Sequence, residues 1–261
     1  MNRYLARRTA LKPAMDGTLR GEPWRVAIRS EPFVDMASGG PAPLETQAAV
    51  LWDDECLYVG FWVEEPYPTA HLTERDSIIF TENDVELFID GGDCYYELEI
   101  NALGTLYEVF FIWRDAYSRG SRFDIPEFDL LSRKAFSFAG DFDRKPESFW
   151  WGTNPRGPRW AFLDWDFPGL QSKVNVEGTL NTPSAKSKGW TVELALPWAG
   201  MKHLAGGRKT PPEVGDVWKM FLGRFQKVQT TGGEAQAAWC LTPHGVYDTH
   251  MPEKFTEIEF V

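Results

Sequence analysis

The sequence predicts an all-β fold, an antiparallel β-sandwich, and two observations support this. Many short segments alternate apolar and polar side chains, the period of a strand with one buried face. The breaks between them carry residues that tight turns require, such as Asp53-Asp54, Gly91-Gly92 and Gly104. Many short strands with frequent turn signals and little helical pattern are typical of a sandwich. With 261 residues, 43% of them hydrophobic, the chain can bury a sizeable core.

The elements are expected in two groups of strands. Residues 1–46 are rich in Pro and Gly and indicate an irregular leading segment with one short edge strand at most. The first group of strands is then expected over Gln47–Trp52, Leu57–Glu64, Val85–Asp90, Tyr95–Asn101 and Leu106–Trp113. The second group is expected over Lys173–Thr179, Trp190–Leu196, Val217–Gln226, Gln236–Leu241 and Phe255–Phe260. Pro197 followed by WAGMKHL predicts a short helix with Pro in its first turn. No internal repeat occurs, so we expect a single domain over residues 1–261.

The segment ENDVELFIDGGDCYYELEINALG, residues 82–104, predicts a β-hairpin whose two faces differ. A two-residue turn at Gly92-Asp93 pairs its strands in a defined register. The core face then holds Val85, Leu87, Ile89, Tyr96, Leu98 and Ile100. The outer face holds three facing pairs, which are Glu86 with Glu99, Phe88 with Glu97, and Asp90 with Tyr95.

The carboxylates on this outer face suggest a binding site. Like charges directly opposite each other destabilise a sheet, so Glu86 facing Glu99 indicates a polar ligand or a cation. The pattern is also compatible with a face that is simply solvated. In a third arrangement, Arg114 and Arg224 pair with the two carboxylates and form a satisfied network.

Residues 114–158 differ from the rest of the chain, because they show no sustained period. Loops of this length are usually functional or disordered, and the aromatic content argues against disorder. We expect an ordered insertion that packs across one face or edge of the sandwich. It could shape a ligand site by packing on Phe88 and Tyr95, or it could only cover a sheet edge. Its aromatic residues are Phe123, Phe128, Phe136, Phe138, Phe142, Phe149, Trp150 and Trp151.

Composition narrows the range of partners and compartments. A net charge of -11 disfavours nucleic acids and anionic membranes, and no run of 18 apolar residues occurs. The start, MNRYLARRTALKPAMDG, has no apolar signal-peptide core, which favours the cytoplasm. Cys56, Cys94 and Cys240 form no CxxC pair, so we expect reduced thiols. The 12 Trp and 18 Phe serve cores first, but also make faces on which sugar rings stack.

The order of five blocks resembles the family 9 carbohydrate-binding modules. These blocks are WDDECLYVGFWVEEP, ENDVELFIDGGDCYYELEINALG, GWTVELALPW, PEVGDVWKMFLGRF and HMPEKF, spread over residues 16–261. The resemblance implies a DOMON-like sandwich of the immunoglobulin-like jelly-roll type. It also implies carbohydrate binding without catalysis, beside glycoside hydrolases in polysaccharide catabolism. The family's usual location is extracellular or periplasmic, which the missing signal peptide does not support.

The resemblance also implies a ligand site that this chain only partly retains. Glu86 matches the family's hydroxyl-bonding glutamate, and Phe80 stands where the first stacking tryptophan would be. Tyr247 is the nearest aromatic to the second tryptophan. Glu99 replaces an arginine, and Asn101 matches in position. With the neighbours on the outer face, the predicted ligand-binding residues are Phe80, Glu86, Phe88, Tyr95, Glu97, Glu99, Asn101 and Tyr247.

Calcium is the one cofactor that the resemblance suggests. No EF-hand-like loop is present, and the candidate ligands Asp53, Asp54, Asp90 and Asp93 are also explained by turn chemistry.

Two alternative functions are compatible with the sequence. Glu86, Glu97 and Glu99 could supply the carboxylate pair of a glycoside hydrolase, although no H-E-x-x-H, P-loop or nucleophile-elbow motif occurs. Haem, which some DOMON-like sandwiches bind through Met and His, is the second alternative. Its possible ligands are His71, His203, His244, His250, Met201, Met220 and Met251, and His250 is expected to fix its loop by hydrogen bonding.

The tryptophans are assigned mainly to packing. Trp62, Trp190 and Trp218 are expected in the core, and Trp52 and Trp198 are expected to pack at the ends of strands. One tryptophan in or beside the insertion is expected to reach the ligand, from the set Trp150, Trp151, Trp160 and Trp165.

Overall fold

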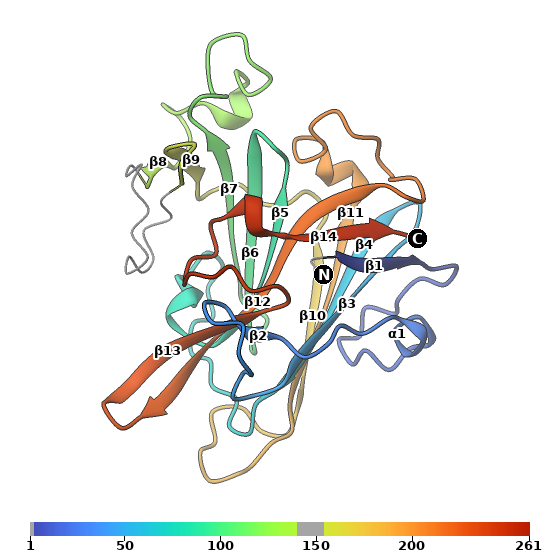
Figure 1. Cartoon of the computed structure of the whole chain (residues 1–261), viewed down its shortest axis with the longest axis vertical. Helices are drawn as coiled ribbons and strands as arrows, with labels where there is room; N and C mark the ends of the chain where they lie inside the picture. Colours follow the sequence, from blue (N-terminus) through green and yellow to red (C-terminus); the bar gives the residue numbers. More distant parts are fainter. Residues whose placement is uncertain (1–2, 140–153) are drawn as a thin grey trace.

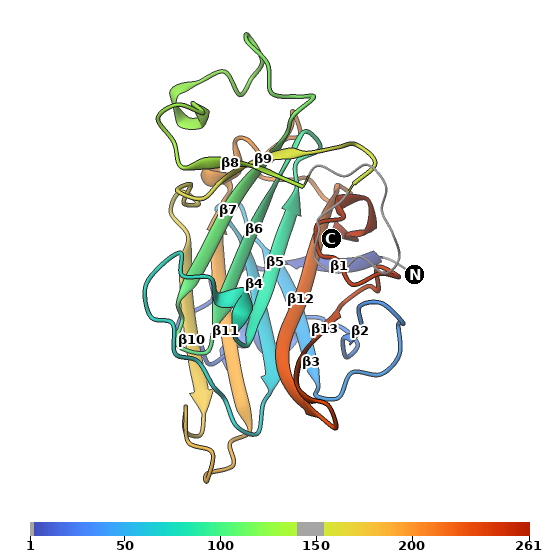
Figure 2. The same cartoon turned by 90° about the vertical axis from the view of Figure 1, so that its left-hand side faces the viewer.

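The computed structural model describes residues 3–139 and 154–261, and in these residues it shows an all-β sandwich, as predicted. One layer has the strand order β10-β11-β4-β3 and the other β14-β12-β5-β6-β7-β9-β8. Figure 2 shows the first layer behind the second. The first layer comprises β3 (Thr46–Trp52), β4 (Cys56–Glu64), β10 (Gln171–Glu177) and β11 (Gly189–Pro197). The second comprises β5 (Asp84–Asp90), β6 (Cys94–Asn101), β7 (Leu106–Trp113), β8 (Ala135–Phe138), β9 (Arg159–Phe162), β12 (Val217–Thr230) and β14 (Thr256–Phe260).

A strand at the start of the chain joins the two layers. β1 (Arg3–Arg8) pairs in parallel with β14 through residues 3–6 and with β3 through Arg7 and Arg8. The two layers therefore form one continuous hydrogen-bonded sheet that folds over at β1 (Figure 1). β13 (Gly233–Cys240) forms a long hairpin with β12 and also pairs with the short β2 (Val34–Asp35).

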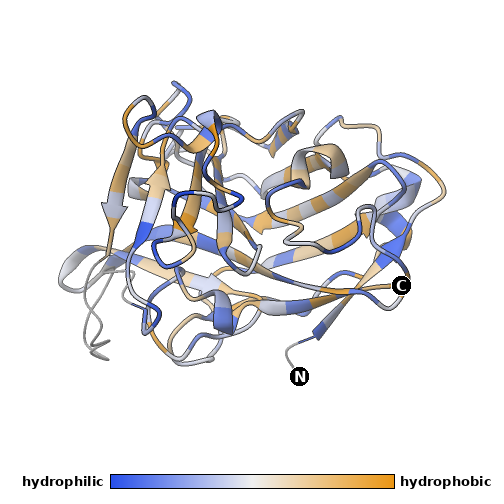
Figure 3. Ribbon diagram, turned by 90° about the horizontal axis from the view of Figure 1, so that it is seen from above, coloured by the Kyte–Doolittle hydropathy of each residue, from blue (hydrophilic) through white to orange (hydrophobic). Residues whose placement is uncertain are grey.

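The main core lies between the layers. It contains all six residues that the hairpin pattern assigned to the core face, Val85, Leu87, Ile89, Tyr96, Leu98 and Ile100. Trp52, Trp190, Trp198 and Trp218 are buried there too, as expected. Along the strands in Figure 3, hydrophobic and hydrophilic colours change from residue to residue, which is the alternation that a half-buried strand requires.

A second aromatic cluster covers the outer face of the second layer. It includes Phe88, Tyr95, Phe111, Phe221 and Phe255, and Phe88 and Tyr95 are fully buried. The expectation that Phe88 and Tyr95 are exposed is therefore wrong. Alternation separates the two faces of a strand, but it does not show that a distant segment, here the chain around His250 and Phe255, covers the second face.

The insertion extends the sheet at its edge. β9 pairs with β7, and β8 pairs with β9, so both strands continue the second layer beyond β7 (Figure 1). The 3₁₀ turn η2 (Pro126–Phe128) precedes them, and the Tyr117 hydroxyl donates to the Phe128 carbonyl at 2.6 Å. The expectation of an ordered segment at an edge is confirmed for residues 114–139 and 154–158. Phe142, Phe149, Trp150 and Trp151 lie outside the described residues.

Helix is sparse in the described residues. α1 (Glu22–Val26) was not predicted, and the helix expected after Pro197 is a single 3₁₀ turn, η3 (Trp198–Met201). Two further 3₁₀ turns are η1 (Ile79–Thr81) and η4 (Pro252–Lys254). None of the described helices has the length and apolar character that crossing a membrane would need.

Candidate functional site

The hairpin of β5 and β6 has the predicted register. Glu86 faces Glu99, Phe88 faces Glu97 and Asp90 faces Tyr95. Because side chains alternate along each strand, this register places four carboxyl groups on the outer face of the second layer. They are those of Asp84, Glu86, Glu97 and Glu99, and all four are buried.

A cavity of about 400 Å³ opens beside these carboxyl groups. Glu97, Glu99, Val109, Phe111 and His250 are buried side chains that form its base. Its rim consists of less buried side chains, which are Phe80, Thr81, Tyr107, Phe136, Phe138 and Gln236.

The rim is built from distant parts of the chain. Phe80 lies in η1, and its ring meets the ring of Tyr107 edge-to-face at a centroid distance of 5.6 Å. Phe138 comes from β8 of the insertion. The centroid of its ring lies 5.2 Å from that of Phe111 and 4.5 Å from that of His250. Two pairs of aromatic side chains, Phe80 with Tyr107 and Phe136 with Phe138, therefore line one cavity.

A buried arginine supports the base of the cavity. Arg159 donates from Nε to the Tyr95 hydroxyl at 3.1 Å and from Nη2 to the His250 carbonyl at 2.9 Å. Its guanidinium lies over Trp113, 4.6 Å from the ring centroid. The Tyr95 hydroxyl is also 3.1 Å from Nδ1 of His250. Burial, followed by the charge of Arg159, lowers the pKa of His250 well below its ordinary value, so this ring is neutral near pH 7.

The carboxyl groups hold their protons unusually strongly. Burial raises the pKa of Glu97 to about 8, although a hydrogen bond with Glu99 and the charge of Arg159 act in the opposite direction. Burial and then neighbouring carboxylates raise the pKa values of Glu86 and Glu99 well above their ordinary range. Burial likewise raises the pKa of Asp84, partly offset by the backbone amide of Phe225. Without a cationic partner, this environment therefore favours the protonated form of these groups.

The aspartates expected to bind calcium do not form a cluster. Asp53 accepts hydrogen bonds from the amides of Glu55 and Cys56, and Asp90 accepts one from the amide of Gly92. Asp54 and Asp93 form ion pairs with arginines, Arg8 and Arg156 respectively. The acidic group that the structure brings together is instead Asp84, Glu86 and Glu99.

The predicted ligand-binding residues are only partly gathered in the cavity. Phe80, Glu97 and Glu99 line it, while Phe88 and Tyr95 are buried among the aromatic side chains of the second cluster. Asn101 faces Asp84 in the same register but is not in the cavity lining, and its side-chain amide donates to the Leu72 carbonyl at 3.0 Å.

Glu86 and Tyr247 lie outside the cavity lining. Glu86 is buried next to Glu99. Tyr247 packs against Phe225, and Glu86 contributes to the raised pKa of its hydroxyl after burial.

The arginines expected to neutralise Glu86 and Glu99 do not do so. Arg224 faces the core side of the sheet and donates to Thr46 and Gln226. Arg114 lies over the ring of Trp160. That pairing is therefore wrong, because alternation along β12 directs Arg224 to the opposite face from Glu86, whose register partner is Gly223.

Sequence reasoning missed several cavity residues and also Asp84, a buried acid next to Glu86 on the same face. Tyr107 faces Glu99 in the register of β6 with β7, and Asp84 lies two residues before Glu86. Extending the alternating pattern by one position on β5 and by one strand to β7 would have placed both residues on the outer face. Gln236 and Phe138 come from distant segments, and no local pattern places them beside the hairpin.

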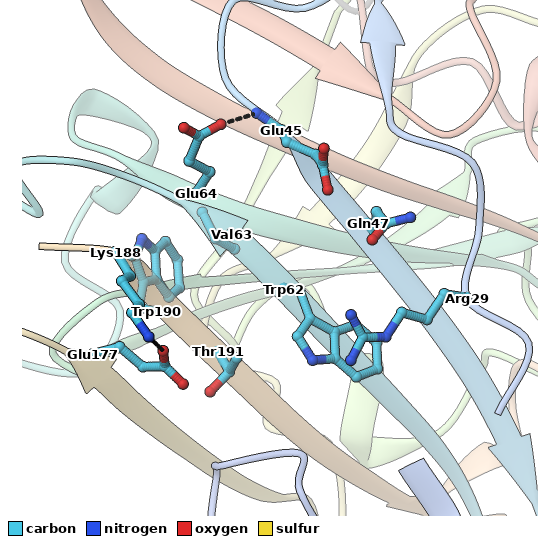
Figure 4. Close-up of a pocket in the computed structure, with 11 residues that line it drawn as sticks. Arg29, Glu45, Gln47, Trp62, Val63, Glu64, Glu177, Lys188, Trp190 and Thr191 are labelled. Carbon is cyan, nitrogen blue, oxygen red and sulfur yellow. Dashed lines mark hydrogen bonds and ion pairs between the residues drawn. The ribbon is translucent and has the colours of Figure 1, made fainter. Parts of the chain in front are cut away.

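A second, smaller hollow of about 170 Å³ lies on the outer face of the first layer. Figure 4 shows Trp62 there with the Arg29 side chain drawn over its ring, and the guanidinium is 3.9 Å from the ring centroid. Trp62 is partly exposed, so its expected place in the core is wrong, because the inward residues of β4 are Phe61 and Val63. Since Arg29 occupies a face of this ring, the hollow is a weaker candidate for a stacking site.

Of the four tryptophans in or beside the insertion, the structure describes Trp160 and Trp165, and neither is in the lining of the aromatic cavity. Trp165 is buried in the main core, and the Arg114 guanidinium lies over the ring of Trp160.

Two of the histidines considered as haem ligands form hydrogen bonds with other residues. His203 bonds Glu127 at 2.9 Å, and His244 lies 2.8 Å from the Asp248 carbonyl.

Comparison with known proteins supports the fold. No family model matches the sequence, and no curated protein matches it. A family 9 carbohydrate-binding module from Caldicellulosiruptor kristjanssonii, solved with cellotriose, is 13% identical with a TM-score of 0.55 over 99% of this chain and 93% of its own. The same description applies to a structure solved with glucose, at 13% identity and TM-score 0.55, covering 99% and 95%. A protein from Bacteroides uniformis ATCC 8492 described as carbohydrate-binding is 12% identical, with a TM-score of 0.58 over 99% of both chains. The chain therefore has the fold of family 9 carbohydrate-binding modules.

Proposed function

We propose that this protein binds a carbohydrate in the aromatic-rimmed cavity and does not cleave it. The observation that carries the proposal is the combination of aromatic side chains and buried carboxyl groups in one cavity on the outer face of the sheet. Sugar rings present apolar faces, which stack on aromatic side chains, and hydroxyl groups, which need hydrogen-bond partners. The fold, shared with carbohydrate-binding modules, adds support.

The cavity offers complementary groups to both parts of a sugar. Phe80 and Tyr107 on one part of the rim, with Phe136 and Phe138 on another, provide surfaces for the ring. Glu97, Glu99, Gln236 and His250 provide the polar groups. The Glu97 carboxyl, whose pKa is raised to about 8, both donates and accepts hydrogen bonds when protonated, which suits the hydroxyl groups of a neutral sugar. Open sites of this kind give affinities from micromolar to millimolar, about -8 to -4 kcal/mol.

The carboxyl groups suit binding better than glycoside hydrolysis. Hydrolases place two carboxyl groups on either side of a glycosidic bond, about 5 Å apart or more. Glu97 and Glu99 instead lie two residues apart on the same face of β6 and act on each other's pKa, and Glu86 is buried. The proposed role is therefore recognition, next to enzymes that degrade the bound glycan.

Binding by titration calorimetry tests this proposal. The panel contains glucose and cello-, xylo- and pectic oligosaccharides, and we expect heat of binding with at least one. Phe80→Ala and Phe138→Ala should each weaken binding about tenfold or more, since a stacked aromatic contributes about 1–3 kcal/mol. Tyr67→Ala is the matched control, because Tyr67 is 51% exposed and lines a different cavity.

Two results would count against the proposal. One is the absence of heat with every sugar in the panel. The other is the release of reducing ends during incubation, which would indicate a hydrolase.

The insertion is proposed to set which sugar is accepted. Phe136 and Phe138 belong to it and line the cavity, while its strands also extend the sheet edge. A Phe138→Ala variant that binds the same sugars with unchanged relative affinities would leave the insertion only the second of these roles.

A further inference from the structure

Three buried carboxyl groups converge beside the cavity. Asp84, Glu86 and Glu99 each offer an oxygen, and these oxygens lie within 4.8 Å of one another. The arrangement follows from the sheet, since Asp84 and Glu86 lie two residues apart on β5 and Glu99 faces Glu86 from β6. The three side chains are at most 1% exposed. Water from the bulk therefore does not solvate their charges.

The converging oxygens also lack partners. Oε2 of Glu86 and Oε2 of Glu99 form no hydrogen bond with any residue in 3–139 or 154–261. The carboxyl oxygens of Asp84 form none of normal geometry in these ranges, although the backbone amide of Phe225 is close enough to act on this carboxyl. Within the same ranges, the charged groups that act on Glu86 are Asp84 and Glu97, which are themselves acidic. Buried polar atoms without partners are costly and call for an explanation. If these groups shared protons directly, hydrogen bonds between them would be expected.

We propose that Asp84, Glu86 and Glu99 bind one calcium ion. Calcium takes oxygen ligands at about 2.3–2.6 Å, so two ligands of one ion can be up to about 5 Å apart. The mutual spacing of these oxygens fits that limit. Arg224 acts on Asp84, and the ion supplies the positive charge that Glu86 and Glu99 lack. The ion also coordinates the oxygens that have no other partner. Its remaining ligands are water or a hydroxyl group, which can approach from the cavity because Glu99 also lines it.

This site differs from the sequence-based candidates, which allows a direct test without any sugar. The protein is stripped with EDTA at pH 7.5 and titrated with CaCl₂, while its melting temperature and its calcium uptake by calorimetry are followed. Terbium luminescence, sensitised by nearby Tyr107 and Tyr247, gives a second readout. We expect one ion per chain and a rise in melting temperature of several degrees.

Conservative variants locate the ion. Glu86→Gln and Glu99→Gln should reduce calcium affinity at least tenfold and abolish the calcium-dependent rise in melting temperature. Both should fold, and without calcium they should be about as stable as wild type, because Gln has nearly the shape of the protonated Glu that burial favours in the absence of a cation. Asp54→Asn is the control. Asp54 is a sequence-based candidate that forms an exposed ion pair with Arg8, so calcium binding should be unchanged.

Two outcomes would overturn the proposal. One is the absence of calcium uptake by the wild-type protein, with melting temperatures equal in EDTA and in calcium. The other is uptake that survives both glutamine substitutions or disappears in Asp54→Asn. Since no sugar is present, neither outcome bears on carbohydrate binding in the cavity.

Discussion

Arg159 shows how a single side chain organises the base of the cavity. Its guanidinium is completely buried and joins β9 to Tyr95 on β6 and to the carbonyl of His250 in the closing segment. An arginine can do this because its planar head offers several donors and also stacks on aromatic rings. The same contacts keep a positive charge next to His250, which helps to hold that imidazole neutral.

His250 should therefore make stability depend on pH. Its pKa is lowered in the folded protein from an ordinary value of 6.5, so the unfolded chain takes up the proton first. The contribution of neutral His250 is present above pH 6.5 and is lost as pH falls below it. Compared with His250→Asn, the wild type should lose up to about 1.4 kcal/mol of unfolding free energy per pH unit in that range. Urea unfolding between pH 5 and 7.5 measures the difference, and parallel curves for the two proteins would contradict it.

At the scale of elements, tight pairing between strands depends on positions where no side chain fits. Gly189 begins β11 with φ +144°, and a Cβ placed there would lie 1.9 Å from the Val63 carbonyl oxygen of β4. Gly92, in the turn between β5 and β6, also has a positive φ but has nothing within 4 Å of a Cβ. A side chain would be strained by the positive φ at both glycines, but only at Gly189 would it also collide with a neighbouring strand.

Gly189→Ala should destabilise the protein much more than Gly92→Ala. We expect about 3 kcal/mol or more for Gly189→Ala, because the added methyl group pushes β11 away from β4. Gly92→Ala should cost about 1 kcal/mol, the strain of a positive φ alone. Chemical denaturation of both variants checks this. Equal losses would mean that the two strands adjust without cost.

The strands that sequence could predict are those with a clear alternating pattern. The β5–β6 register and its core face followed from alternation and from the turn at Gly92. β1 was missed because RYLARR has few apolar residues and depends on partners at the far end of the chain. In the site, Phe80, Glu97 and Glu99, which the sequence suggested as ligand-binding residues, line the cavity. Gln236 and Phe138 were not, because tertiary packing alone brings them there.

At the scale of the whole molecule, β1 holds the two layers together. It pairs with β14 on one side and β3 on the other, and it buries Tyr4 and Ala6. Without it, two sheet edges would be open, and open edges promote association between chains. β1 should therefore contribute more to stability than a strand of six residues at the edge of a sheet would.

Deleting residues 1–8 should lower the unfolding free energy by about 3 kcal/mol or more, through the lost burial of Tyr4 and lost backbone hydrogen bonds. The deletion should also promote oligomers. Arg3→Ala is the control, because it removes only exposed ion pairs with Glu257 and Glu259, which contribute little to stability. Urea unfolding and size-exclusion chromatography measure both effects. A monomeric deletion variant of unchanged stability would show that β1 is dispensable.

The parallel pairing of β1 with β14 also determines how the fold bears mechanical load. Arg3 lies beside Glu257 and Ala6 beside Phe260, so the two strands run in the same direction. A force that pulls the chain ends apart acts along the strands and loads their hydrogen bonds together instead of one after another. Val261 adds to this, since its amide donates to the Ala6 carbonyl while its own carbonyl accepts from Arg8. The fold should therefore resist extension when it is pulled by its two chain ends.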